Sequence, residues 1–327
     1  DTTVNAWSDM NANAGYNDDS FTFSGGALSS INFFTTVTDV AGVTRAFVGQ
    51  GGSLKAAKLD VDANGDYDAV SDTKAIGLSG AVTVSDVSAS ATVSGTVDAH
   101  IGSAKGTTPS SNIGIVDITG PITVDAIGNM LASPDILSVG AAGILQLSLL
   151  EQVATVSGSV LGYIGEGVDV DAASIAIFAD APEMKADIQA SSFTGAGLVD
   201  GSIGSAIATV SGTVEAFIGA GSAQQAANVT TDVDVDSGTI TVVADAEMHA
   251  VSNLTSVGFG GVVSFGSFTP TAIVNGATRA FVRDGVNLDA GKLDVSAGKL
   301  GGVDRVVNKA EATAFGVNVS FLAAVTN

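Results

Sequence analysis

The chain has 327 residues, with 34 acidic side chains, 12 basic side chains and no cysteine, so its formal net charge is −22. Disulfide-stapled miniproteins and cysteine zinc sites are excluded, and so acidic a chain is unsuited to binding nucleic acid through its phosphates. Hydrophobic residues make up 46% of the chain but aromatic residues only 6%, which predicts a thin core of small side chains.

The start of the chain shows no basic residue followed by an apolar run, so we expect no signal peptide within it. No stretch approaches the ~18 apolar residues of a spanning helix, and we therefore expect no membrane insertion. The lack of cysteine and the excess of aspartate are typical of exported proteins in a calcium-rich or salt-rich medium. We expect an extracellular location, on a bacterial cell surface.

A short phrase built around one aromatic ring or histidine recurs six times. Its copies centre on Trp7, Phe47, His100, Tyr163, Phe217 and Phe281, with spacings of 47 − 7 = 40, 100 − 47 = 53, 163 − 100 = 63, 217 − 163 = 54 and 281 − 217 = 64. The peptide Ala-Thr-Val-Ser-Gly precedes three copies, at 91–95, 154–158 and 208–212. Tandem units of this length indicate a solenoid or an array of domains.

Apolar and polar residues alternate strictly over long stretches, as at 87–101 and 240–250. This period of two predicts half-buried β-strands. Helices are expected only as short excursions, one over 125–131 and one beginning at Ser133-Pro134-Asp135.

Two all-β architectures are compatible with these strands: a parallel β-solenoid (β-helix) built from imperfect repeats, or tandem β-sandwich domains spanning two units each. Sandwich cores usually need bulky aromatic residues, and the chain has one Trp and three Tyr, which favours the solenoid. With ~20 residues and a rise of ~4.8 Å per coil, the rod would be roughly 70 to 80 Å long.

The two ends of the sequence predict a single elongated segment over 1–327 that is uncapped at both ends. Residues 321–327 resemble the approach to the repeated phrase, and residues 1–7 resemble its completion. Because an open sheet edge recruits another strand, we expect continuation in a longer chain or head-to-tail stacking of the chain on itself.

The phrase Ala-Thr-Val-Ser-Gly-Thr-Val-Glu-Ala-Phe-Ile-Gly at 208–219, followed by the Asp-Val-Asp-Val strand at 232–235, resembles repeats of giant bacterial exoproteins, the filamentous-haemagglutinin-like and leukotoxin-type adhesins. The resemblance covers most of the chain. It implies secretion across a Gram-negative envelope, a β-helical shaft, and a role in adhesion, biofilm or surface filaments. No secretion domain or receptor-binding module of that family is recognisable in the chain.

One acidic run has the spacing of a calcium loop. Oxygen ligands at alternate positions around a glycine that permits a sharp turn would be Asp60, Asp62, Asn64, Asp66 and Asp68, with Asp72 one residue beyond the usual closing position. The alternative interpretation is a solvated turn between strands. We expect bound Ca²⁺ to stiffen the rod.

The six ring residues of the phrase form the second candidate site, because alternation places several of them on the polar face. Trp7, Phe47, His100, Tyr163, Phe217 and Phe281 either line up to bind a partner such as a surface glycan, or form a second small core under loops. Exposed, aligned aromatic residues promote aggregation, which favours the second interpretation.

The sequence gives little support for catalysis, since His100 and His249 are the only histidines and no cysteine is present. We therefore predict a structural, adhesive protein that forms the shaft of a surface filament or giant adhesin, and not an enzyme. The alternatives are a glycan- or surface-binding adhesin module and a β-helical carbohydrate-active enzyme.

Overall fold

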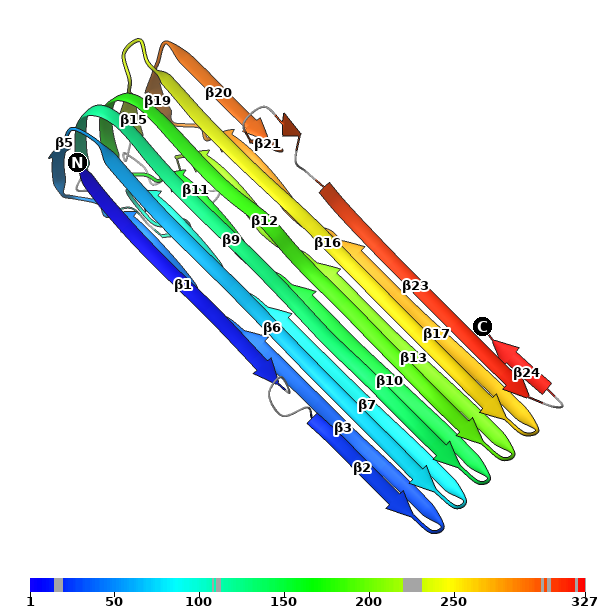
Figure 1. Ribbon diagram of the computed structural model, residues 1–327. Coiled ribbons are helices and arrows are strands. Elements are labelled where there is room, and N and C mark those ends of the chain that lie inside the picture. Colours follow the sequence, from blue (N-terminus) through cyan, green and yellow to red (C-terminus); the bar gives the residue numbers. More distant parts are fainter. Residues whose placement is uncertain are drawn as a thin grey trace.

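A computed structural model describes residues 1–14, 20–107, 109, 113–219, 231–300, 303–304, 307–320 and 323–326. The predicted parallel β-solenoid is confirmed: successive coils pair through parallel strands, and within the described ranges every regular element is a strand (Figure 1). In those ranges no helix is long and apolar enough to cross a membrane. Tandem sandwich domains are wrong, because Lys299–Leu300 and Val303–Asp304 (β21 and β22) form the only antiparallel pair described.

The coils contribute strands to three parallel sheets, which we call A, B and C. Sheet A contains β1 (Thr2–Ala14), β2 (Ser20–Gly26), β5 (Ser53–Ala56), β6 (Leu59–Ser79), β9 (Gly114–Ala142), β12 (Val168–Ala196), β15 (Thr231–Asp234), β16 (Thr239–Gly260), β19 (Val286–Asp289), β20 (Lys292–Ala297) and β23 (Val307–Ser320). Sheet B contains β3 (Ser29–Val40), β7 (Val82–Val93), β10 (Leu145–Val156), β13 (Val199–Val210), β17 (Val263–Val274) and β24 (Ala323–Thr326). Sheet C contains β4 (Val43–Val48), β8 (Thr96–Ile101), β11 (Ser159–Ile164), β14 (Thr213–Ile218) and β18 (Ala277–Val282).

Each coil is wide and flat. Register in sheet C gives coil lengths of 96 − 43 = 53, 159 − 96 = 63, 213 − 159 = 54 and 277 − 213 = 64 residues. The longest strands, β9 and β12, have 29 residues and are each roughly 95 Å long at 3.3 Å per residue. The estimate of ~20 residues per coil is therefore wrong: the strands run along the long dimension, and six coils rise only about 25 Å.

The alternation of shorter and longer coils originates where sheet C returns to sheet A. In the two longer coils, β8 ends at Ile101 and β9 begins at Gly114, and β14 ends at Ile218 and β15 begins at Thr231. In a shorter coil, β11 ends at Ile164 and β12 begins at Val168. Extra residues therefore enter at one edge of the solenoid and leave the register of the strands intact.

A row of large side chains fills the core opposite the corner between sheets B and C. All four methionines of the chain belong to this row together with Tyr67: they are Met10, Met130, Met184 and Met248, and their strands pair in register. Each faces a corner glycine of the next sheet. A Cβ on Gly158 would lie 2.2 Å from Met130 Sδ, and one on Gly212 would lie 2.3 Å from Met184 Cε. The glycine of the Ala-Thr-Val-Ser-Gly peptide therefore makes room for this row.

The two predicted helices are wrong, since residues 125–131 and 133–135 both lie in β9. Pairing with β6 on one side and β12 on the other supplies the backbone partners of β9 and overrides local helix signals. Pro134 aligns with Ser71 of β6 and points into the core. Pro121 and Pro182 lie at register shifts between β9 and β12, where a missing N–H is tolerated.

The first copy of the phrase is not equivalent to the others. Trp7 lies in β1 of sheet A, opposite Asn64, whereas the other five ring residues lie in sheet C. The prediction that residues 1–7 complete the phrase approached by residues 321–327 is therefore wrong for residues 1–7, because they lie in sheet A and not in sheet C. Ala323–Thr326 does occupy sheet B, as the approach to the phrase should, while 321–322 and 327 lie outside the described residues.

Replacing a corner glycine tests this core. Gly158→Ala should lower the free energy of unfolding by roughly 1 to 3 kcal/mol, because its Cβ meets Met130 Sδ and the backbone oxygen of Gly95, 2.5 Å away. Gly52→Ala is the matched control, since nothing lies within 4 Å of its Cβ. Thermal unfolding followed by circular dichroism measures both variants, and an unchanged midpoint for Gly158→Ala would contradict this packing.

Candidate functional site

Five ring side chains form one continuous column on the outer face of sheet C. Parallel register brings each ring over the next, and the planes are within 10° of parallel. Centroid distances are 5.2 Å from Phe47 to His100, 4.9 Å from His100 to Tyr163, 4.5 Å from Tyr163 to Phe217 and 5.1 Å from Phe217 to Phe281. Such spacings are those of stacked aromatic pairs, and the equal-length phrases make them recur from coil to coil.

The middle of the column is closed to solvent. His100 is 2% exposed and Tyr163 and Phe217 are 0% exposed, whereas Phe47 at the edge is 51% exposed. The backbone N–H of Lys105 donates to the Tyr163 hydroxyl at 2.8 Å, which fixes part of the following loop over the rings. Partner binding by the six ring residues is therefore wrong for the buried members, which form the second small core with Leu161.

Charged side chains run beside the rings in a second row. Asp98 accepts hydrogen bonds from His100 Nδ1 at 2.8 Å and from Arg45 Nε at 2.9 Å, although its side chain is only 3% exposed. Glu215 accepts from Arg279 at 3.0 Å and also pairs with Lys105. Asp98 and Glu215 thus each have charged partners, which offset the cost of burying their carboxylates. Burial and the charge of Asp98 raise the pKa of Tyr163, so this phenol stays protonated.

The predicted calcium loop is wrong in shape. Asp60, Asp62, Asn64, Asp66, Asp68 and Asp72 all lie on the outer face of one unbroken strand, β6, and Gly65 makes no turn. Alternate residues of a strand are about 6.6 Å apart, too far for their oxygens to surround one ion at 2.3 to 2.6 Å. Within the described residues, no group of three or more acidic or histidine side chains is placed to hold a metal. The residues present do not fit the predicted Ca²⁺ loop.

Carboxylates instead line up across the coils of sheet A. Asp117, Asp171, Asp234 and Asp289 occupy one row, which Lys55 begins. Lys55 Nζ lies 2.5 Å from Asp117. Asp62 aligns with Asp125 and Asp72 with Asp135 in the same manner.

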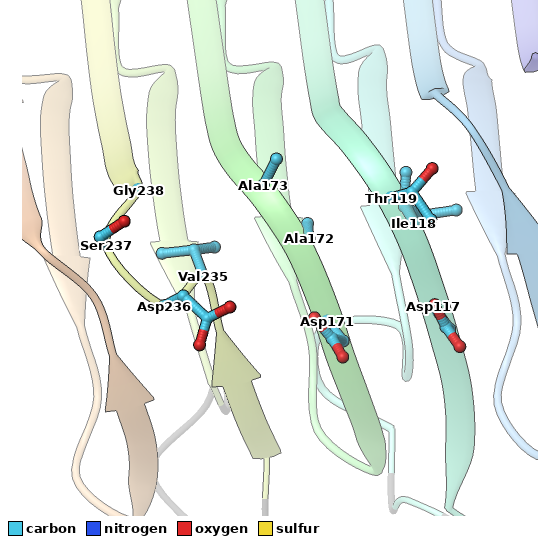
Figure 2. Close-up of a pocket in the computed structure, with 10 residues that line it drawn as sticks. All are labelled: Asp117, Ile118, Thr119, Asp171, Ala172, Ala173, Val235, Asp236, Ser237 and Gly238. Atoms are coloured by element: carbon cyan, nitrogen blue, oxygen red, sulfur yellow. The ribbon is translucent and has the colours of Figure 1, made fainter.

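A hollow of about 400 Å³ lies beside this row, and Figure 2 shows Asp117, Asp171 and Asp236 around it. Asp236 has a φ of 45°, and its N–H donates to Asp234 Oδ1 at 2.8 Å, which orders the short connection to β16. The hollow is lined mainly by small side chains and contains no basic residue or histidine.

Burial and neighbouring like charges raise the pKa of carboxylates on the outer face of sheet A. Burial, with the neighbouring charges of Asp62 and Asp180, raises the pKa of Asp125 to about 6. Burial and Asp232 likewise raise the pKa of Asp169. The outer face of sheet A therefore holds carboxylates that take up protons more readily than in the unfolded chain.

Sequence reasoning missed two rows. One is the row of charged residues beside the rings, which we call the ion row, and the other is the row of aspartates on sheet A, which we call the aspartate row. Each row joins residues more than 50 positions apart in the sequence. The signal was present in the coil spacings: 98 − 45 = 53 separates Arg45 from Asp98, and 279 − 215 = 64 separates Glu215 from Arg279. No protein-family model, curated protein or solved structure matches the chain.

The buried column predicts a stability role for its central rings. Phe217→Ala should lower the free energy of unfolding by roughly 3 to 5 kcal/mol, since a fully buried aromatic side chain is lost. Phe47→Ala, at the exposed edge, should cost much less. Chemical denaturation measures the difference, provided that both variants show the same slope of unfolding free energy against denaturant concentration. Equal losses of unfolding free energy in the two variants would argue against the second core.

The raised pKa values predict a pH dependence of stability. Because Asp125 has a folded pKa of about 6, above its unfolded value of 3.8, its ionised form opposes folding above pH 6 and this penalty is relieved as the pH falls towards 4. The thermal midpoint should therefore rise between pH 7.5 and pH 5. Asp125→Asn should raise the free energy of unfolding at pH 7.5 by on the order of 1 kcal/mol, given partial solvent screening, and so raise the thermal midpoint.

Asp39→Asn is the charge-matched control, since Asp39 is exposed in β3 and aligns with Thr92 instead of another carboxylate. It should leave the pH dependence intact. A midpoint that falls steadily from pH 7.5 to pH 5 would contradict the repulsion between stacked carboxylates.

Proposed function

We propose that the chain is a segment of the shaft of an extracellular bacterial surface filament or giant adhesin, lengthened by further coils that stack on its two open ends. The observation that carries the proposal is the difference between terminal and internal coils. Phe47 is 51% exposed, while its equivalents one and two coils inward are 2% and 0% exposed. A ring of this column is buried only when a coil lies on each side of it.

The outermost strands support the same proposal. Sheets B and C end at β3 and β4 on one side, and at β24 and β18 on the other. Apolar side chains of the first coil are widely exposed, with Phe33 at 73%, Val37 at 67% and Val43 at 57%. A long edge with such side chains recruits a further strand unless something covers it, and no described segment does.

The ion row gives the adjoining coil a chemical requirement. Its members are Arg45, Asp98, Leu161, Glu215 and Arg279 in order of coil, so arginine lies at both ends. A coil with an acidic residue at this position, as in β8 and β14, would complete the row. In a direct stack of two copies Arg279 would face Arg45, a repulsion that salt screens.

The resemblance of the repeated phrases to filamentous-haemagglutinin-like and leukotoxin-type adhesins supports a shaft in such a protein. The wide parallel solenoid is suited to a load-bearing element, since hydrogen bonds join every coil to the next along its full width.

Sedimentation velocity and electron microscopy of the purified chain test stacking. We expect concentration-dependent end-to-end association that strengthens between 50 mM and 500 mM salt, because screening reduces repulsion between chains of net charge −22. Val43→Lys with Phe47→Lys, on the edge strand β4, should weaken it at least tenfold. Ser90→Lys, on the outer face of β7 and away from the edge, is the control.

Monomers at every protein and salt concentration would contradict end-to-end stacking of this chain. If Ser90→Lys weakens association as much as Val43→Lys with Phe47→Lys does, the contact does not involve the edge of sheet C.

A further inference from the structure

One end of every coil, where sheet A turns into sheet B, has an unusual surface. We call it the tip, and it consists of residues 75–85, 136–149, 191–203 and 255–267 in the four central coils. The turns lie side by side at the lower right in Figure 1. Asp200 is the only acidic or basic residue in these four stretches, and it is 0% exposed. The tip is thus free of exposed charge in a chain of net charge −22.

Large apolar side chains cover both outer faces of the tip and its turns. On sheet A, Leu78 is 42% exposed, Phe193 45% and Phe259 57%. Leu198 at a turn is 46% exposed and Ile203 on sheet B is 44% exposed. A hollow of about 520 Å³ lies against Phe259 and Val319 on the same end. Phe193 and Phe259 lie on the paired strands β12 and β16, and Phe259 aligns with Val319 of β23, whereas Leu78 lies in β6 on the other side of β9.

The interior of the tip is polar, which reverses the pattern of the rest of each strand. Near its start, β12 points Ile175 and Ile177 inward, but near its end it points Ser192 and Thr194 inward and Phe193 outward. Some of the interior groups bond to one another: Thr194 Oγ1 donates to Asp200 at 3.0 Å, and Ser264 donates to the same carboxylate at 3.3 Å. The reversal means that the outer face of the tip, and not its interior, matches an apolar environment.

Several backbone N–H groups of the turns are also bonded within the protein. The N–H of Ile144 donates to Ala81 O at 2.9 Å, that of Leu198 to Ile144 O at 3.3 Å, and that of Val262 to Leu198 O at 2.9 Å. These bonds continue the ladder of the sheets around the end of the coil. Each paired N–H group lowers the penalty that excludes most loops from lipid.

We propose that the tip inserts into a lipid layer. In the third coil the uncharged stretches run from after Asp135 to the turn and from the turn to before Glu151, six or seven residues each and about 20 Å deep. Half of a bilayer hydrocarbon core is ~15 Å thick. A second copy of the chain would cover one face, whereas a lipid layer surrounds both faces and the turns at once.

This inference revises the expectation of no membrane insertion, which considered only spanning helices. It does not depend on the proposed shaft function, because it concerns the side of the coils and not their open ends. The acidic face of sheet A would remain in water, with Asp72 and Asp135 at the boundary.

Flotation with vesicles of phosphatidylcholine, a lipid of no net charge, tests insertion by the whole chain. We expect the chain to float with the vesicles, and Phe193→Asp with Phe259→Asp to weaken binding at least tenfold. Ile207→Asp with Ile273→Asp is the matched control, since these side chains are 39% and 40% exposed on sheet B outside the tip. The control should bind within twofold of the unaltered chain, and circular dichroism should show all variants folded.

A single introduced cysteine gives a readout independent of affinity, because the chain contains none. An environment-sensitive fluorophore on Leu198→Cys should shift to shorter wavelength and be quenched by lipids with spin labels in the acyl chain. The same fluorophore on Asn64→Cys, on the acidic face, should not respond. Failure to float, equal loss in both aspartate pairs, or a response at Asn64→Cys alone would overturn the proposal. Lipid-free association that only the tip variants abolish, without flotation, would assign the tip to contact between copies instead.

Discussion

Parallel, in-register hydrogen bonding between successive coils is the constraint on which the rest of the structure depends. It continues from strand to strand in all three sheets and around the turns, so each residue lies beside its equivalent in the next coil. Side chains therefore occur in rows. The ring column, the methionine row, the ion row and the aspartate row all follow from this single register, and each has a different chemistry because each position faces a different environment.

Because equivalent side chains lie beside one another in successive coils, a favourable or unfavourable contact at one position is repeated along the whole row. A ring stacks on a ring with favourable geometry, as Tyr163 does on Phe217, and a corner glycine repeated in each coil admits a methionine in each coil. A carboxylate stacked on a carboxylate is unfavourable, and the neighbouring charge of Asp62 adds to burial in raising the pKa of Asp125. The sheet C face avoids this repulsion because Leu161 separates its two carboxylates and an arginine lies beside each of them, whereas the outer face of sheet A keeps its charge in contact with water.

The sequence sufficed to predict the all-β solenoid, because strict alternation and the repeated phrase report strand period and coil length directly. Its preference for covered rings holds for His100, Tyr163 and Phe217, whereas Trp7 and Phe47 are 71% and 51% exposed. It did not predict the width of the coil, because a long strand with a change of inward residue type resembles two strands separated by a turn. The Asn64-Gly65-Asp66 stretch shows this best: it has turn composition, yet pairing with β1 and β9 keeps it extended.

The proportions of the coil have a mechanical consequence. From Arg45 to Arg279 four coils consume 279 − 45 = 234 residues, and at ~4.8 Å per coil this is about 12 residues for each ångström of height. Each added coil therefore lengthens the stack very little, because most of its residues extend across the width of the coil. The stack has the cross-section of a tape, which resists bending in the plane of its broad face and yields most readily across its thin dimension. A pull along the stack would stretch dozens of hydrogen bonds between each pair of coils simultaneously, so the load would be distributed across the whole breadth of the tape.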